Sequence, residues 1–208
     1  MRVLIIGSGG REHALGLKVA KSPLLTKLYI APGNPGMGDI ATLVPIGVQE
    51  KDKLVAFVKE EKIDMVLIGP EAPLMLGLAD DLALLDIPVL GPTAKAAEIE
   101  GSKAFSKDLM KKYGIPTGAY AVFSEVQPAL AYLETSAFPI VIKADGLAAG
   151  KGVIIAEDLG TAKEAVCNIM EEKVFGEAGN RVVIEEFLEG EELSLLAFTD
   201  GKTVVPMV

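Results

Sequence analysis

The first hundred residues alternate between short apolar runs and segments whose apolar side chains recur at helical spacing. The runs contain few polar positions, as is typical of strands in a parallel sheet covered on both faces. The predicted strands are Arg2–Ile6, Lys27–Ala31, Ile63–Ile68 and Ile87–Leu90. The predicted helices between them are Ala14–Lys21, Gln49–Lys62 and Leu74–Leu85. This alternation predicts an α/β fold with a doubly wound parallel sheet over residues 1–101.

Two helices, Thr93–Glu100 and Ser102–Tyr113, are predicted to follow this sheet. Ser102 is a good N-cap because its hydroxyl can accept a hydrogen bond from a free backbone N–H group. Lys103 and Lys107 are four residues apart and therefore share a helix face. A solvated basic face is the commoner fate of helical lysines, so this spacing alone assigns them no function.

From residue 115 onward the pattern changes to shorter apolar runs with turn residues close by. The predicted strands are Tyr120–Phe123, Ile140–Lys143, Val153–Ala156 and Arg181–Ile184. The predicted helices are Ser124–Thr135 and Leu159–Glu172. Near the end, two further apolar runs, Leu193–Thr199 and Thr203–Val205, flank the turn Asp200-Gly201. Residues 102–208 are therefore predicted to form a second unit.

The most informative stretch lies between two of these strands, where residues 139–152 read PIVIKADGLAAGKG. An apolar run leads to Lys143, and a loop with three glycines and a second lysine, Lys151, follows. Glycines let backbone N–H groups approach phosphate oxygens, and lysines add positive charge. Strand, glycine loop and strand are the pattern of a flap that closes on an anionic ligand, although ordinary hairpin turns also contain glycines.

This loop does not match the Walker phosphate-binding motif, G-x-x-x-x-G-K-[ST] between a strand and a helix. Counting back from Gly150 and Lys151, the first motif position is Asp145, and Gly152 replaces the hydroxyl residue. The residues that follow also resemble a strand rather than a helix. The sequence therefore predicts a hairpin-type glycine loop.

A second glycine-rich loop, GSGGREH at 7–13, follows the first predicted strand. The dinucleotide fingerprint G-x-G-x-x-G requires glycine where this chain has Glu12, and no acidic residue follows the second strand to hold a ribose. NAD is therefore disfavoured, whereas a mononucleotide or sugar phosphate can bind at a helix N-terminus. His13, the single histidine, is more typical of packing or capping than of catalysis at this position, despite its suitable pKa.

Three loops are predicted to gather at the carboxyl ends of the parallel strands: 7–13, 31–36 and 69–73. Ligands bind at this edge of doubly wound sheets. Each loop taken alone is also consistent with simple turn chemistry, because glycine and proline fix turns.

An acidic run, EEFLEGEE at 185–192, begins at the end of a predicted strand. A solvated acidic turn is the default interpretation for most of its carboxylates. The run also contains Phe187 and Leu188, whose backbone could pair with an adenine edge while a glutamate accepts from ribose hydroxyls. Carboxylates can also hold Mg²⁺ together with phosphates.

Composition narrows the function classes. The chain has 208 residues, a net charge of −9 and a pI of about 4.8, which argues against broad nucleic-acid binding. No stretch approaches the length of a membrane span, and no signal peptide is present, so no membrane partner is expected. One cysteine, Cys167, fits a reducing cytosol and a cytoplasmic protein. The chain ends in an apolar run, TVVPMV, which suggests the first part of a longer protein.

Six motifs follow one another along the chain: GSGGREHA at 7–14, PGNPG at 32–36, GPEAPL at 69–74, GSKAFSK at 101–107, KADGLAAGKGV at 143–153 and VIEEFLEGEELS at 183–194. Together they resemble the phosphoribosylamine–glycine ligase (glycinamide ribonucleotide synthetase) family of the ATP-grasp superfamily. The glycine-loop and acidic motifs alone indicate only ATP-grasp, and the first three narrow the resemblance to this family. It covers essentially the whole chain.

The resemblance implies a fold and a reaction. The fold is an N-terminal domain of the pre-ATP-grasp type at 1–101, then an incomplete ATP-grasp domain at 102–208 with a mobile flap subdomain at about 121–188. The family joins glycine to 5-phosphoribosylamine with ATP in purine biosynthesis. ATP phosphorylates the glycine carboxylate, and the amine then attacks the acyl phosphate, which gives glycinamide ribonucleotide, ADP and phosphate. An enzyme accelerates such a phosphoryl transfer mainly by positioning the reactants and neutralising the charge of the transferred group.

The resemblance also implies site residues, all of them by motif match. Lys103 and Lys143 would contact ATP phosphates, and Lys143 is expected to matter more than Lys107 because it stands at the mouth of the flap. Glu192 would hold the ribose. The flap over the phosphates would contain Gly150, Lys151, Gly152 and Val153. The adenine edge would be framed by Glu185, Glu186, Phe187 and Leu188. The sugar-phosphate or glycine side would be formed by Gly9, Gly10, Arg11, Glu12, His13, Pro70 and Glu71.

Other features of the family are expected outside this chain. Family members are about twice as long, and the ligands of Mg²⁺ or Mn²⁺ lie in a later segment, so no metal ligand is assigned here. The chain by itself is expected not to catalyse the ligase reaction. The oligomeric state does not follow from the sequence.

Three alternatives remain open. Another ATP-grasp carboxylate–amine ligase is disfavoured by the REHA and PGNPG motifs. A nucleotide-dependent oxidoreductase on the first sheet is disfavoured by Glu12. The third alternative is a non-catalytic nucleotide-binding module.

Overall fold

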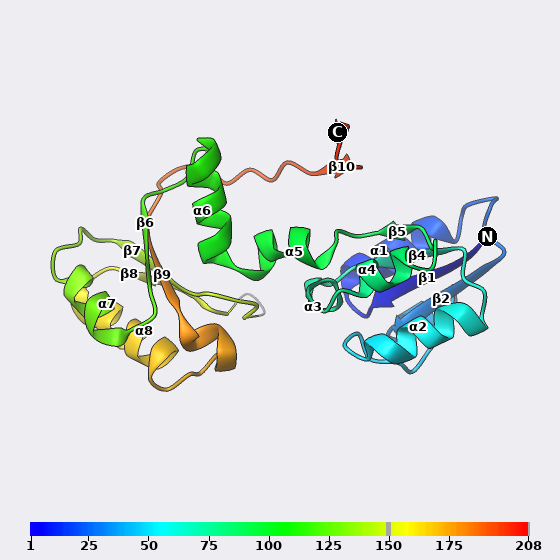
Figure 1. The fold of residues 1–208 in the computed structure, drawn as a ribbon, viewed down its shortest axis with the longest axis horizontal. Helices are drawn as coiled ribbons and strands as arrows, with labels where there is room; N and C mark the ends of the chain where they lie inside the picture. Colours follow the sequence, from blue (N-terminus) through cyan, green and yellow to red (C-terminus); the bar gives the residue numbers. More distant parts are fainter. Residues whose placement is uncertain (149–150, 208) are drawn as a thin grey trace.

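The computed structural model describes residues 1–148 and 151–207. Two sheets, each with its own helices, lie at opposite ends of the molecule, and helix α5 runs between them (Figure 1). The first sheet is built from residues 2–90 and the second from residues 120–186. This mixed α/β architecture, with a parallel sheet in the N-terminal part, is the predicted fold class.

The first sheet is entirely parallel and has the strand order β3-β2-β1-β4-β5. Four of its strands match the apolar runs of the sequence within two residues. The fifth, β3, was not predicted, because two residues carry too little pattern. The strands are β1 (Arg2–Gly7), β2 (Lys27–Pro32), β3 (Thr42–Leu43), β4 (Met65–Ile68) and β5 (Val89–Leu90).

Alternate residues of the strands enter two different cores, because successive side chains point to opposite faces of a sheet. On β1, Leu4 and Ile6 pack with helices α2, α3, α4 and α5. Val3 and Ile5 pack on the other face, against which the end of α1 lies. These helices are α1 (Gly10–Val19), α2 (Lys51–Glu60), α3 (Glu71–Met75), α4 (Leu78–Ala83) and α5 (Ala94–Gly101). Burial on both faces explains the unbroken apolar runs.

Two helix predictions for this part were wrong in their bounds. Helix α1 begins at Gly10, four residues before the expected start, so the whole REH motif lies inside the helix. The single helix expected at 74–85 is two short helices, α3 and α4, separated at Gly77. Gly77 has φ +79°, a left-handed conformation that interrupts a right-handed helix.

Helix α6 (Lys103–Tyr113) follows α5 and leads to the second sheet. The Ser102 hydroxyl accepts from the Phe105 N–H at 3.1 Å, as expected of an N-cap. At the other end Gly114 adopts φ +66° and ends the helix.

The second sheet is antiparallel, with the order β6-β9-β7-β8. Its strands are β6 (Tyr120–Phe123), β7 (Ile140–Ala144), β8 (Val153–Ala156) and β9 (Val182–Glu186). Helices α7 (Val126–Leu133) and α8 (Leu159–Met170) cover one face, where Ile142 and Ile184 are fully buried. After β9 the chain runs away from this sheet to the exposed hairpin of β10 (Ala197–Thr199) and β11 (Val204–Pro206) (Figure 1).

Candidate functional site

The predicted glycine loop joins two antiparallel strands, so the hairpin interpretation is confirmed. Lys143 near the end of β7 stands opposite Val153 at the start of β8. Within the loop the Lys151 N–H donates to the Ala148 carbonyl at 3.0 Å. Gly150 lies outside the described residues. A strand, and not a helix, follows the loop, which distinguishes it from a Walker loop.

The described end of the loop combines a buried glycine with exposed neighbours. Gly152 is buried, and a Cβ at this position would come within 2.6 Å of the Ala148 Cβ. Lys151 and Val153 on either side are exposed. The tight approach at Gly152 explains why the loop carries no larger residue there.

Lys143 and Glu185 meet on the face of the second sheet that α7 and α8 leave open. Ile142 and Ala144 point into the helix-covered core, so Lys143 between them points to the opposite face. Glu185 on β9 belongs to the same face, and its Oε2 lies 2.9 Å from the Lys143 Nζ. Two candidate residues, 42 positions apart, are thus in direct contact.

Lys107 also contacts this carboxylate, which the sequence interpretation missed. Its Nζ lies 2.9 Å from Glu185 Oε2 and donates to the Thr117 hydroxyl at 2.8 Å. The side chain is only 12% exposed, so the expectation of a solvated face was wrong for Lys107. The reason is tertiary: α6 lies against the open sheet face and turns Lys107 toward Glu185. Its four-residue spacing from Lys103 was the available signal.

Lys103 lies at the base of the glycine loop. Its Nζ donates to the Gly146 carbonyl at 2.9 Å, which joins the start of α6 to the start of the loop. Burial lowers the pKa of Lys103, the Asp145 charge opposes this shift, and the Lys143 charge adds to it. Lys103, bound to Gly146, and Lys143, opposite Val153, thus both lie at the base of the glycine loop.

Asp145 joins the start of α6 to the hairpin, a role that the sequence pattern did not indicate. Its carboxylate is completely buried and accepts from the Ser102 hydroxyl and the Ala104 N–H, both at 3.1 Å. Arg181 Nη2 lies 2.5 Å from the other oxygen. Asp145 thus fixes the N-terminus of α6, and with it Lys103, against the hairpin.

Glu185 is buried, and only one of its two carboxylate oxygens is paired. The ammonium groups of Lys107 and Lys143 both contact Oε2. Oε1 is buried without a hydrogen-bond partner among the described residues. A buried acceptor without a donor is rare in proteins and calls for an explanation. A ligand that donates an N–H or O–H group to Oε1 would provide one.

The remaining acidic candidates lie further along the chain, toward solvent. Glu186 is exposed, and its carboxylate accepts from the Ala119 N–H at 2.9 Å. Phe187 is half-buried, and Leu188 is 65% exposed. Glu192 is exposed as well, so the structure does not bring it to the lysine cluster.

The loops of the first sheet gather at its carboxyl edge, as predicted. The Asn34 side chain of the second loop donates to the Ser8 carbonyl of the first at 2.8 Å, and Arg11 lies 4.0 Å from Glu71 of the third. A hollow of about 200 Å³ opens between the first and third loops. It is lined by Gly9, Gly10, Arg11, Glu12, Gly69, Pro70 and Glu71.

Glu12 fills the space that a dinucleotide fingerprint keeps open. It is only 6% exposed, and its Oε2 accepts from the Gly9 N–H at 2.7 Å. A Cβ at Gly69 would come within 2.2 Å of its Oε1, and one at Gly7 within 2.5 Å of its Cγ. The carboxylate therefore stands among the glycines at the start of α1, in agreement with the sequence argument against NAD.

His13 and Cys167 show no catalytic arrangement. His13 is half-buried at the fourth position of α1, and a Cβ at Gly36 of the second loop would lie 3.5 Å from its ring. Cys167 is half-buried on α8, where burial raises the pKa of its thiol. A raised pKa reduces the thiolate fraction and so the nucleophilicity of the thiol.

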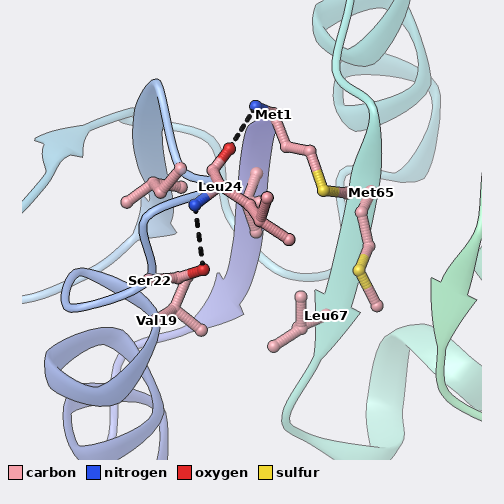
Figure 2. A pocket seen from close by; sticks show the side chains of 8 residues that line it. Met1, Val19, Ser22, Leu24, Met65 and Leu67 are labelled. Carbon is pink, nitrogen blue, oxygen red and sulfur yellow. Dashed lines mark hydrogen bonds between the residues drawn. The ribbon is translucent and has the colours of Figure 1, made fainter.

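An apolar pocket of about 210 Å³ lies at the amino edge of the first sheet, away from these loops (Figure 2). The Met1 amino group donates to the Leu24 carbonyl at its rim at 2.5 Å, and side chains of Val19, Met65 and Leu67 line it. No acidic or basic side chain lines the pocket. It therefore offers space for apolar packing and no charged side chain for acid–base chemistry.

Among residues 1–148 and 151–207, no group of three or more His, Cys, Asp or Glu side chains is arranged to hold a metal ion. No helix there is both long enough and apolar enough to cross a bilayer.

Comparison with known proteins gives matches along the whole chain. The family model for the N domain of phosphoribosylglycinamide synthetase matches residues 1–100, and the model for its ATP-grasp (A) domain matches residues 101–208. The phosphoribosylamine–glycine ligase of Halalkalibacterium halodurans is 54% identical over 208 residues, which are all of this chain and 49% of that protein. That of Brucella melitensis is 55% identical over 207 residues and is covered to 48%.

A solved structure supports the same assignment. The phosphoribosylamine–glycine ligase of Thermotoga maritima superposes with a TM-score of 0.82 at 33% identity, and the match covers 99% of this chain and 49% of that one. The chain thus spans about half the length of the relatives it matches. With both family models matched in order, the chain belongs to the phosphoribosylglycinamide synthetase family.

Proposed function

We propose that this chain supplies the nucleotide-binding hairpin and part of the substrate pocket of an ATP-dependent ligase that joins glycine to 5-phosphoribosylamine. The family assignment and the names of the relatives support the activity. The observation that carries the proposal is the cluster of Lys103, Lys143 and Glu185 beneath a glycine-rich hairpin. A purely structural hairpin has no need of two lysines at its base.

In this proposal the polyphosphate of ATP lies between the hairpin and the start of α6. Lys103 and Lys143 neutralise phosphate charge, and backbone N–H groups of the hairpin donate to phosphate oxygens. The nucleoside lies along 185–188, where Glu185 Oε1, which has no partner among the described residues, accepts a hydrogen bond from the adenine amino group. Glu192, which is exposed, reaches the ribose only if its segment moves toward the sheet.

The proposed chemistry is acyl activation followed by amide formation. A carboxylate oxygen of glycine attacks the γ-phosphorus of ATP, which forms glycyl phosphate and releases ADP. The amine of 5-phosphoribosylamine then attacks the glycyl carbonyl carbon, loses a proton, and expels inorganic phosphate. The contribution of the protein is to align the reactants, neutralise charge and exclude water.

The hollow at the carboxyl edge of the first sheet is the proposed place for the sugar phosphate or glycine. Gly10 and Arg11 offer donors to an anion beside Gly9, and Glu71 offers an acceptor to an amine or hydroxyl group. Glu12 contributes indirectly, because its bond to Gly9 fixes the loop. His13 borders the second loop and has no proposed chemical role.

A divalent cation, Mg²⁺ or Mn²⁺, is expected to accompany ATP in this family. The described residues do not fit such an ion, since no cluster of three or more ligand side chains is present among them. No step is therefore assigned to the metal here. The single Cys167 suits a reducing compartment, and we include a cytoplasmic location in the proposal.

Amide hydrogen exchange of the chain with and without Mg-ATP tests the placement. We expect protection at 143–153 and 183–192, with little change at 1–100. Protection confined to 7–13 and 69–73 would move the nucleotide to the first sheet and overturn the proposed site. The Lys103→Ala variant serves as the control, because it should lose the protection at 143–153 while it keeps the exchange pattern of the first sheet.

A further inference from the structure

We propose that Lys107 is the resident counter-ion of Glu185, and that it thereby frees Lys143 to bind a ligand phosphate. Lys107 is thus a positioning residue: it acts through Glu185 and Lys143 and does not itself contact the ligand. The inference rests on the proposed function, because the phosphate concerned belongs to ATP.

The charges in the cluster do not balance without a ligand. Two ammonium groups, those of Lys107 and Lys143, lie 2.9 Å from the same oxygen of one buried carboxylate. One positive charge is enough to neutralise Glu185. The second is a surplus, and a polyphosphate can use it.

The contacts of the two lysines indicate which one remains paired with Glu185. Lys107 donates to the Thr117 hydroxyl at 2.8 Å, lies 5.8 Å from the centre of the Tyr120 ring and is 12% exposed. Lys143 is 25% exposed and stands at the start of the glycine loop. Contacts with Glu185, Thr117 and Tyr120 hold Lys107 in place, whereas Glu185 is the only partner of Lys143 among the described residues.

Lys143 can move to a phosphate only if Glu185 keeps a partner. A buried charge that loses its only counter-ion destabilises a protein strongly. With Lys107 in place, the departure of Lys143 leaves an intact ion pair. Without Lys107, Lys143 is the sole counter-ion of Glu185 and is held away from the ligand.

The ion pair can be tested without nucleotide by thermal unfolding of single and double variants. We expect Lys107→Met to lower the Tm by roughly 3–8 °C. The same substitution in a Glu185→Gln background should lower it by less than half as much, because no charge remains to be neutralised. Lys143→Met should cause a smaller shift than Lys107→Met. Lys111→Met, at an exposed position one turn further along α6, is the control and should leave the Tm unchanged.

The release of Lys143 can be tested by calorimetric titration of the same variants with Mg-ATP. Lys107→Met should weaken binding about tenfold, and the loss should shrink to about threefold or less in the Glu185→Gln background. A role in packing alone would give equal losses in both backgrounds, and that result would overturn the proposal. Circular dichroism of each variant verifies that it is folded.

The two readouts separate this inference from the proposed function. If the wild-type chain binds no Mg-ATP, the proposed function of the hairpin fails, and the unfolding experiment still decides whether Lys107 is the counter-ion. If the wild-type chain binds Mg-ATP and Lys107→Met binds it equally well, the proposed function stands and the inference about Lys107 fails.

Discussion

Glu12 and Glu185 are both buried carboxylates, but their partners differ in kind. Glu12 accepts from the backbone of Gly9, next to its own helix, so it stabilises a loop. Glu185 pairs with two lysines that arrive from α6 and β7, and one of its oxygens has no partner among the described residues. The first arrangement is complete without a ligand, and the second is not. Glu185 is therefore the stronger candidate for direct ligand contact.

Lys143→Ala tests the proposed phosphate contact at the scale of one residue. A charge-assisted hydrogen bond contributes about 1.5–3 kcal/mol, so we expect the affinity for Mg-ATP to fall roughly ten- to a hundredfold. Isothermal titration calorimetry measures this directly. Lys111→Ala, an exposed lysine on α6, is the control and should bind as the wild type does. An unchanged affinity in Lys143→Ala would remove Lys143 from the site.

Lys143 is expected to matter more than Lys107 because it stands at the mouth of the flap, and the structure adds that Lys107 contacts the same carboxylate as Lys143. Which of the two lysines matters more for ATP binding stays a prediction. The structure favours Lys143 for the direct contact because its side chain is the more exposed of the two.

A pair of glycine substitutions tests the packing of the two units. A Cβ at Gly179 would lie 2.2 Å from the Ile169 carbonyl oxygen, which belongs to the backbone and cannot move easily. We expect Gly179→Ala to lower the free energy of unfolding by about 1–3 kcal/mol. Gly10→Ala, with no atom within 4 Å of the new Cβ, should be neutral or raise it by up to about 1 kcal/mol. Urea denaturation measures both as shifts of the midpoint from wild type, and a Gly179→Ala midpoint equal to that of the wild type would contradict the geometry.

At the scale of elements, the glycine hairpin and α6 form one assembly although residues 114–139 separate them in the chain. Asp145 joins the hairpin to Ser102 and Ala104, and Lys103 joins α6 to Gly146. A ligand held by the hairpin is therefore held against α6 as well. This linkage explains how lysines from two elements can serve one phosphate group.

Helix α8, which covers the second sheet, has an acid-sensitive start. The Asp158 carboxylate accepts from the Thr161 N–H at 2.9 Å and from its hydroxyl at 3.1 Å, and the backbone bond lowers the pKa of Asp158 below 3.8. Because the folded pKa lies below the unfolded one, this cap stabilises the fold fully above the unfolded pKa. The stabilisation is lost as the pH falls through the folded pKa.

Asp158→Asn should flatten this part of the acid dependence. Asparagine caps a helix at every pH, so the difference in Tm between wild type and variant should narrow as the pH falls from 5 toward 3. Thermal unfolding followed by circular dichroism across this range measures the effect. Parallel profiles for the two proteins would show that the Asp158 cap does not titrate in this way.

At the scale of the whole molecule, the chain contains separate cores. The buried residues of the first sheet fall between Val3 and Ala97, and those of the second between Ala129 and Ile184. Since no buried cluster formed by residues 1–148 and 151–207 spans both sheets, the two units can unfold separately. This supports the proposed division near residue 101, where the two matched family models also meet.

We therefore expect more than one transition when the chain is unfolded in a calorimeter. Mg-ATP should raise the midpoint of the transition that belongs to residues 102–208, by an amount equivalent to about 2.7 kcal/mol when ATP is present at 100 times its Kd. The transition of the first unit should not move. A single transition that shifts as a whole with Mg-ATP would show that the two units unfold together.

The sequence by itself determined the elements and the family. Continuous apolar runs specify strands buried on both faces, and glycine loops specify turns, because these features depend on neighbouring residues. The strands β1, β6 and β8 could be predicted within one residue, and the ordered motifs identified the family. Short elements such as β3 could not be predicted, because two residues do not define a hydrophobic period.

Only the tertiary structure decided how the side chains of the site are paired. Lys107 looked like an exposed helical lysine, and Asp145 like a loop residue, until α6 was placed against the second sheet. The partners of these residues lie 78 and 41 to 43 positions away along the chain. Burial and pairing of charges depend on which distant elements meet, and local periodicity carries no information about that.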